Sequence, residues 1–100
     1  MKKYKNTLQK GSVRYIVFKE DGVWYAAGLE FNIVEEGSTP QEAMLLLFEA
    51  LSGYVESAKK ISILNQKSDS EYEQMWENIE NNKLEQTKKV FTSGQLNFTN

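Results

Sequence analysis

The sequence predicts a single α+β domain, in which a three-stranded antiparallel sheet is followed by a helix, a second helix and a short C-terminal strand or hairpin. Two local patterns support this prediction. An Asp-Gly pair at 21–22 separates two runs rich in β-branched and aromatic residues, which is typical of a β-hairpin. A helix-start signal at 38–42 precedes apolar residues at helical spacing. The length of 100 residues suits one hydrophobic core and no second one.

The hairpin is expected from strands at 13–19 and 23–29, joined through Asp21 and Gly22. A two-residue turn there makes Phe18 face Tyr25 across the pair. The face that we expect to pack on the core carries Ile16, Phe18, Val23, Tyr25, Ala27 and Leu29. The opposite face is apolar as well and therefore needs a cover of its own. It carries Tyr15, Val17, Trp24 and Ala26.

A third strand is predicted over 32–36, after a tight bend near 30–31, and Gly37 ends it. Glu30, Glu35 and Glu36 lie close to this strand, and paired carboxylates can act as acid and base or hold Mg²⁺. Consecutive residues of a strand point to opposite faces, so Glu35 and Glu36 do not form such a pair. We interpret all three carboxylates as charges that face solvent at the edge of the sheet.

The first helix has the clearest start signal in the sequence. Thr39 takes the N-cap position, Pro40 the first helical position and Glu42 the third, which together form a capping box. The helix is expected to run to about Ala58. A helix with so wide an apolar surface is expected to contact more than one neighbour. Its core side carries Ala43, Leu46, Leu47, Ala50, Leu51 and Tyr54, and a second apolar edge carries Met44, Phe48 and Val55.

A second helix is predicted over 70–81, where Ser70 and Glu73 fit another capping box. Its narrow apolar stripe consists of Tyr72, Met75, Trp76 and Ile79. The segment 61–64 fits a short strand. Near the C-terminal end, two apolar runs flank Ser93 and Gly94, which predicts either a small hairpin or one bent edge strand.

These elements divide the domain into a basic N-terminal arm (1–12), a β-β-β-α core (13–58) and an extension with the second helix and the C-terminal strand (59–100). The net charge is only −2, but segment 69–85 is rich in Asp and Glu. We interpret the arm and this acidic segment as solvated charged surfaces. No apolar run is long enough for a signal peptide or a membrane span, so we expect a cytoplasmic protein.

The residue types present exclude most catalytic chemistry. The sequence contains no His and no Cys, which removes the commonest general base, the thiol nucleophile and the usual transition-metal ligands. It also contains no Gly-rich phosphate loop and no G-x-S-x-G motif, since its glycines occur singly. We therefore expect no enzymatic activity, no catalytic residue, no metal site and no cofactor.

Two segments of the chain resemble the HicB-like antitoxin family. One is the hairpin 15–26 (YIVFKEDGVWYA), and the other is the helix start 37–43 (GSTPQEA), followed by Leu46, Ala50, Leu51 and Tyr54. The resemblance covers about half of the chain. In that family an acidic-Gly turn leads to a proline-containing bend and then to a G-x-T-x-x-E-A helix start. Here 29–33 (LEFNI) stands where that bend would be and contains no Pro.

The resemblance implies a core similar to a reduced ribonuclease H-like fold without nuclease activity. It also implies a function, which is to bind and neutralise a small RNA-cleaving toxin, such as a HicA-like protein, or a similar protein partner. Related antitoxins often carry a C-terminal DNA-binding motif, but the acidic segment 69–85 opposes phosphate contacts. We therefore expect no direct DNA binding.

Two alternatives to the toxin-binding function remain open. The first is an orphan regulatory or scaffold module that binds another protein. The second is a weak single-stranded nucleic-acid binder, in which Tyr15 and Trp24 stack on bases and the basic arm contacts phosphates.

The expected partner-binding residues come from two apolar surfaces that one helix and one sheet face cannot bury together. They are Tyr15, Val17, Trp24, Met44, Phe48 and Val55. The second helix can cover one of these surfaces, which leaves the other for a protein partner or for a second copy of the chain. We therefore expect a homodimer, a larger oligomer or a complex with another protein.

Overall fold

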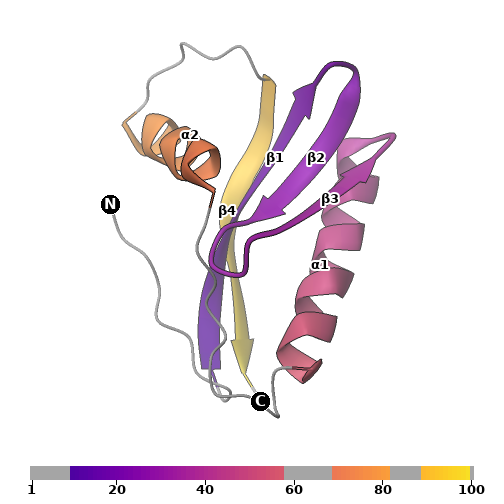
Figure 1. Cartoon of the computed structure of the whole chain (residues 1–100), viewed down its shortest axis with the longest axis vertical. Helices are drawn as coiled ribbons and strands as arrows, with labels where there is room; N and C mark the ends of the chain where they lie inside the picture. The colour runs from indigo at the N-terminus through magenta and orange to yellow at the C-terminus, as the bar shows by residue number, and fades with distance from the viewer. Residues whose placement is uncertain (1–9, 58–68, 82–88, 100) are drawn as a thin grey trace.

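The computed structural model describes residues 10–57, 69–81 and 89–99. Its elements follow one another in the order β1 (Lys10–Glu20), β2 (Val23–Gly28), β3 (Ile33–Gly37), α1 (Pro40–Ser57), α2 (Ser70–Glu80) and β4 (Lys89–Thr99) (Figure 1). The predicted α+β class and the predicted succession of three strands, two helices and a C-terminal strand are confirmed. The proposed strand at 61–64 lies outside the described residues.

The strands form one antiparallel sheet in the order β3-β2-β1-β4. The hairpin has the predicted register, with Phe18 opposite Tyr25 and Ile16 opposite Ala27. Its turn residues Asp21 and Gly22 both have positive φ angles, 52° and 82°. A two-residue turn of this kind matches the right-handed twist of the strands that it joins, so the short Asp-Gly sequence is sufficient to set the register.

The C-terminal segment is a single edge strand, and the alternative of a small hairpin is wrong. β4 pairs with β1 from Lys10 opposite Thr99 to Lys19 opposite Lys89, with one irregularity between Val17 and Phe18. Gly94 is therefore a mid-strand residue. It makes room for the ring of Tyr15, because a Cβ atom at Gly94 would lie 2.9 Å from the Tyr15 hydroxyl oxygen.

The start of β1 corrects the predicted division of the chain. The strand begins at Lys10, so the last residues of the expected basic arm belong to the sheet. Pairing explains the difference, because the long strand β4 extends β1 beyond the apolar run that signals it in the sequence. Residues 1–9 lie outside the described part of the chain.

The N-terminus of α1 is capped largely as predicted. The Thr39 Oγ1 atom accepts a hydrogen bond of 3.0 Å from the Glu42 N–H group. The Glu42 carboxylate accepts one of 2.7 Å from the N–H group of Ser38, one residue before the N-cap. Both bonds satisfy donors that have no partner within the helix.

The cap of α2 differs from the prediction by one residue. Asp69 is the N-cap, and its side chain accepts a hydrogen bond of 2.9 Å from the Glu71 N–H group. The expected box between Ser70 and Glu73 is not formed, since the Glu73 carboxylate binds Arg14 instead. Neither described helix has the length and apolar character that a membrane span requires.

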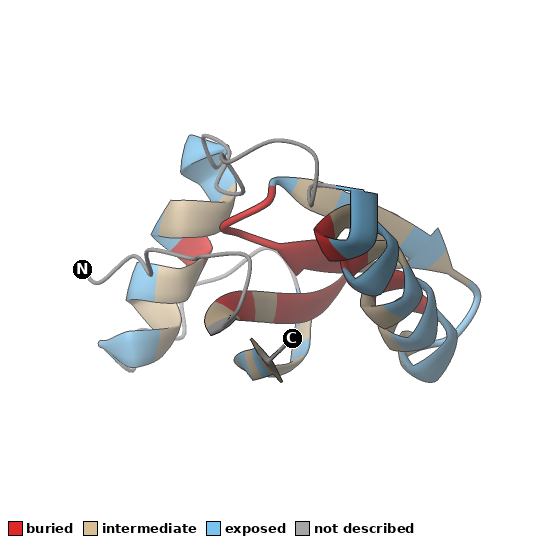
Figure 2. Ribbon diagram, turned by 90° about the horizontal axis from the view of Figure 1, so that it is seen from below, coloured by how far each residue is buried: buried red, intermediate tan, exposed pale blue. Residues whose placement is uncertain are grey.

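The two helices cover opposite faces of the sheet (Figure 2). α1 packs on the face that contains Val17 and Ala26, and α2 packs on the face that contains Ile16 and Phe18. The sequence predicted the reverse arrangement. The first helix was expected on the Phe18 face, and the Val17 face was expected to be covered by the second helix or by a partner. Glycine explains the position of α1, because a Cβ atom at Gly28 would lie only 3.0 Å from the Leu51 Cδ2 atom.

Candidate protein-binding surface

The six predicted binding residues lie together where α1 meets the sheet. We call this line of contact the seam, and it consists of Tyr15, Val17, Trp24, Met44, Phe48 and Val55. Val17 and Val55 are buried in the seam, and the other four are partly buried against the same core cluster. The expected helix edge and the expected sheet face are therefore not two separate surfaces. They meet because α1 covers the Val17 face.

The aromatic residues of the seam contact other aromatic rings of the chain. The ring of Tyr15 meets Phe48 edge to face, with 5.5 Å between the ring centroids. Trp24 meets Phe91 in the same way at 5.8 Å, and the Lys19 Nζ atom lies 5.6 Å from the Trp24 ring centroid. Phe91 itself is 49 % exposed. The seam therefore ends, near the hairpin turn, in an accessible aromatic and cationic group.

A groove opens beside the C-terminal half of α1, between this helix and the β1–β4 pair. Its volume is about 210 Å³, and its lining residues are Val13, Phe31, Leu51, Ser52, Val55, Glu56, Leu96 and Phe98. Pockets for drug-sized ligands begin at about 300 Å³. The groove thus suits a small apolar group, such as one side chain of a partner, better than a cofactor.

The outer side of α1 carries an exposed apolar stripe that was not predicted from the sequence. Glu42, Leu45, Leu46 and Glu49 follow one another at helical spacing and form one surface. We call these four residues the α1 stripe. Leu45 is 61 % exposed and Leu46 is 37 % exposed. Much of the α1 ribbon has the colour of exposed residues in Figure 2.

The α1 stripe corrects the predicted core side of the helix. Leu46 was expected in the core and is exposed, whereas Val55 was expected at a spare edge and is buried. The buried line consists of Ala43, Leu47, Leu51 and Val55. A signal was present in the sequence, because three consecutive leucines at 45–47 point in directions about 100° apart and cannot all face the core.

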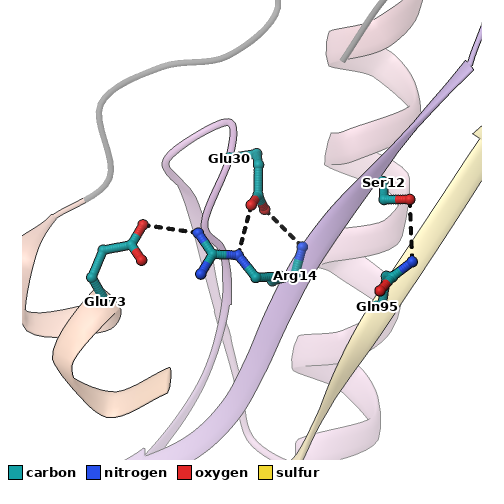
Figure 3. Close-up of polar contacts among 5 residues, drawn as sticks. All are labelled: Ser12, Arg14, Glu30, Glu73 and Gln95. Carbon is teal, nitrogen blue, oxygen red and sulfur yellow. Dashed lines mark hydrogen bonds and ion pairs between the residues drawn. The ribbon is translucent and has the colours of Figure 1, made fainter. Parts of the chain in front are cut away.

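A buried ion cluster was not predicted either. Arg14 and Glu30 are 1 % and 0 % exposed. The Glu30 carboxylate accepts hydrogen bonds from the Arg14 Nε atom at 2.6 Å and from the Arg14 backbone N–H group at 2.8 Å. The Arg14 Nη2 atom donates to Glu73 of α2 at 3.0 Å (Figure 3), and the guanidinium lies 5.5 Å from the Trp76 ring centroid.

This ion cluster overturns the interpretation of Glu30 as a solvent-facing charge. Glu36 is exposed as expected, and Glu35 is half-buried. Strand alternation offered a signal, since Arg14 shares a face with Ile16 and Phe18 and therefore needs a buried anion. Both carboxylates bind one guanidinium, so the cluster attaches α2 to the sheet. Among the described residues, no three His, Cys, Asp or Glu side chains gather to hold a metal ion.

The α1 stripe differs from the other exposed apolar positions of the described residues. Those positions, Val34 on β3 and Phe91 on β4, are single side chains, whereas the stripe joins two leucines with carboxylates on one helix face.

No protein-family model matches the chain, and no curated protein or solved structure is significantly similar to it.

Proposed function

We propose that this chain is a non-catalytic HicB-like antitoxin-type protein that binds and neutralises a small RNA-cleaving toxin or a similar protein partner. The observation that carries the proposal is the α1 stripe, in which Leu45 and Leu46 are exposed between Glu42 and Glu49. Adjacent exposed leucines on a helix are typical of an interaction surface, because single exposed apolar residues are common but grouped ones are not.

The charge of α1 favours a basic partner. The helix carries Glu42, Glu49 and Glu56 and no Lys or Arg. A protein that cleaves RNA needs Lys and Arg side chains to contact phosphates, so its substrate surface is positively charged. An acidic surface is attracted to such a site and accelerates the encounter. A protein that covers the site then prevents RNA from entering.

The seam extends the proposed contact area beyond the α1 stripe. Phe48 lies three residues after Leu45 and is therefore its neighbour on the helix surface. Met44, Tyr15 and Trp24 continue the partly buried apolar surface toward the sheet. Val17 and Val55 lie beneath this surface and support it. Complete burial of a leucine side chain contributes about 1.5–3 kcal/mol, so we expect Leu45 to dominate the binding energy of the stripe.

The test uses two variants of the α1 stripe and one control. Leu45→Ser/Leu46→Ser removes the apolar groups without changing the charge, and Glu49→Lys reverses one charge without changing the cap, which depends on Glu42. Gln74→Lys places a positive charge on the exposed surface of α2 and serves as the control. Each protein is used as bait in a cell extract, and the retained proteins are identified by mass spectrometry and tested for RNA cleavage.

We expect the unchanged chain and Gln74→Lys to retain the same small basic protein and both stripe variants to lose it. The purified retained protein should cleave RNA, and a molar equivalent of the unchanged chain should stop the cleavage. A retained protein without RNA-cleaving activity would contradict the toxin-binding function and favour the orphan protein-binding module. Equal inhibition by the stripe variants would show that the α1 stripe is not the binding surface.

One observation favours the alternative of nucleic-acid binding. Near the hairpin turn, exposed Phe91 contacts the Trp24 ring, and exposed Lys19 lies over the same ring. Lys19 is also directly opposite Lys89 in the register of β1 and β4. Aromatic rings next to lysines are suited to single-stranded nucleic acids. Fluorescence anisotropy with a labelled single-stranded RNA oligonucleotide tests this function. Salt-dependent binding that is lost in Phe91→Ala would support it, and no binding at low salt would exclude it.

A further inference from the structure

The two edges of the sheet differ in length and in charge. β3 has five residues, of which Glu35 and Glu36 are charged. β4 has eleven residues, and Lys89 at its start is the only charged one. Natural sheets protect their edges with short strands, charged side chains or Pro. β3 has the first two of these protections, whereas β4 is long, nearly uncharged and without Pro.

Hydrogen bonds show in which direction the backbone of β4 points. The Arg14 carbonyl oxygen accepts a hydrogen bond from the Leu29 N–H group, and the Arg14 N–H group donates to Glu30, so both groups point to the β2 side of β1. Along an antiparallel strand these groups alternate between the two sides. Tyr15 therefore directs its backbone groups to β4, where Gly94 is its partner.

The same alternation fixes the outer edge of β4. Because Gly94 bonds to β1, its neighbour Ser93 directs its N–H and C=O groups away from β1. Asn97 lies in the same outward set, since Leu96 is opposite Val13 and directs its own groups to β1. In the described part of the chain, β4 is the last strand of the sheet, and these outward groups can bond to another strand.

β4 is also compatible with a second copy of itself. In a twofold antiparallel pair, each strand meets its own sequence in reverse, so charged residues near the middle would repel each other. The middle of β4 has no charge, and the Lys89 residues of two copies lie at opposite ends of such a pair. β3 could not pair in this way, because its adjacent carboxylates Glu35 and Glu36 would face the same carboxylates of the second copy.

We infer that two copies of this chain pair through the outer edges of their β4 strands, which join the two sheets into one continuous antiparallel sheet. The half-buried apolar residues Leu96 and Phe98 would then gain neighbours from the second copy. α1 packs mainly along β2 and β3, so the α1 stripe stays accessible in the dimer. The dimer therefore presents one stripe on each copy, and dimerisation can fail without affecting the proposed partner binding.

Two variants test the edge, and one serves as a matched control. Ser93→Pro removes an outward N–H group while leaving the bonds of Gly94 and Thr92 to β1 in place. Gln95→Lys/Asn97→Lys places two positive charges at exposed positions of the β4 edge. Val34→Lys/Glu36→Gln adds the same charge to the β3 edge, on the same face of the sheet. Light scattering coupled to size-exclusion chromatography gives the mass of each protein over a concentration series.

The unchanged chain and the β3-edge control should have twice the mass of one chain at high concentration. Both β4 variants should have the mass of one chain, with the cooperative thermal transition retained. If Ser93→Pro fails to fold, the lysine variant decides the result. A monomeric unchanged chain, a dimer that persists in the lysine variant, or a dimer that is lost in the β3-edge control would each overturn the inference.

Discussion

At the scale of single residues, Arg14 on β1 connects the sheet to α2 through its ion pair with Glu73. Strand alternation puts its side chain on the α2 face among apolar groups, where an unpaired charge is costly. Glu30 and Glu73 provide the counter-charges, and the Trp76 ring lies beside the guanidinium. The Arg14 Nη1 atom is buried with no hydrogen-bond partner within the described structure. Because the desolvation of buried charges offsets much of their attraction, we expect the cluster to fix where α2 lies more than it stabilises the fold.

Two glutamine substitutions separate the roles of the carboxylates. Glu30 is 0 % exposed, so Glu30→Gln leaves the Arg14 charge with one partner in a buried site and should cost about 3 kcal/mol of unfolding free energy. Glu73 is 22 % exposed, and Glu73→Gln should cost about 1 kcal/mol or less, because water replaces the lost partner. Urea denaturation measures both values. Equal losses of unfolding free energy in the two variants would show that the burial of each carboxylate does not determine how much it contributes.

At the scale of elements, α1 carries two apolar lines with different partners. Ala43, Leu47 and Leu51 face the sheet, and Leu45 with Leu46 faces outward. The close approach of the helix to β2 depends on small residues at the contact. A glycine at position 28 leaves space for three side chains, since a Cβ atom there would lie 3.0 to 3.5 Å from Leu51, Val13 and Leu47.

Alanine at two glycines tests this close approach. Gly28→Ala should destabilise the protein by about 1–3 kcal/mol, because the added methyl group forces α1 away from β2. Gly53 lies in α1 with nothing within 4 Å of an added Cβ atom. Gly53→Ala should stabilise it by about 0.5–1 kcal/mol through higher helix propensity. Thermal melts should show a lower melting temperature for Gly28→Ala and a higher one for Gly53→Ala. An unchanged melting temperature for Gly28→Ala would mean that α1 and β2 can move apart at no cost.

At the scale of the whole molecule, both helices pack on the same sheet, one on each face. Adjacent residues of β1 supply the two cores, Val17 to the α1 core and Ile16 with Phe18 to the α2 core. Neither helix can detach without exposing one apolar face of the sheet. We therefore expect the described elements to unfold together, in a single cooperative transition.

Aspartate at a buried and at an exposed leucine of α1 tests this cooperativity. Leu47 is 0 % exposed, and Leu47→Asp should abolish cooperative folding, since it buries an unpaired charge in the α1 core. The signals of Trp24 near α1 and Trp76 near Arg14 should then be lost together. Leu45→Asp is the control at a 61 % exposed position and should change stability by no more than about 0.5 kcal/mol. A Leu47→Asp melt that matches the unchanged protein would contradict the placement of α1.

Local interactions allowed several features to be predicted from the sequence. The turn at Asp21 and Gly22 depends on backbone angles of two residues, and the cap at Thr39 depends on hydrogen bonds to residues within one helical turn. Periodicity likewise predicted both helices and the first three strands, and the seam residues lie on β1, β2 and α1. The six seam residues were expected on two apolar surfaces that one helix and one sheet face cannot bury together. Instead, α1 and the Val17 face bury Val17 and Val55 and partly bury the other four.

The sequence by itself determined where the elements begin and which residues are apolar, because these depend on neighbours within a few positions. Tertiary structure alone decided which sheet face α1 covers, since both faces are apolar and alternation cannot rank them. It also decided the length of β4, which depends on pairing with β1. The bonds of Arg14 to Glu30 and Glu73 span 16 and 59 residues, and no local pattern encodes a contact at such a distance.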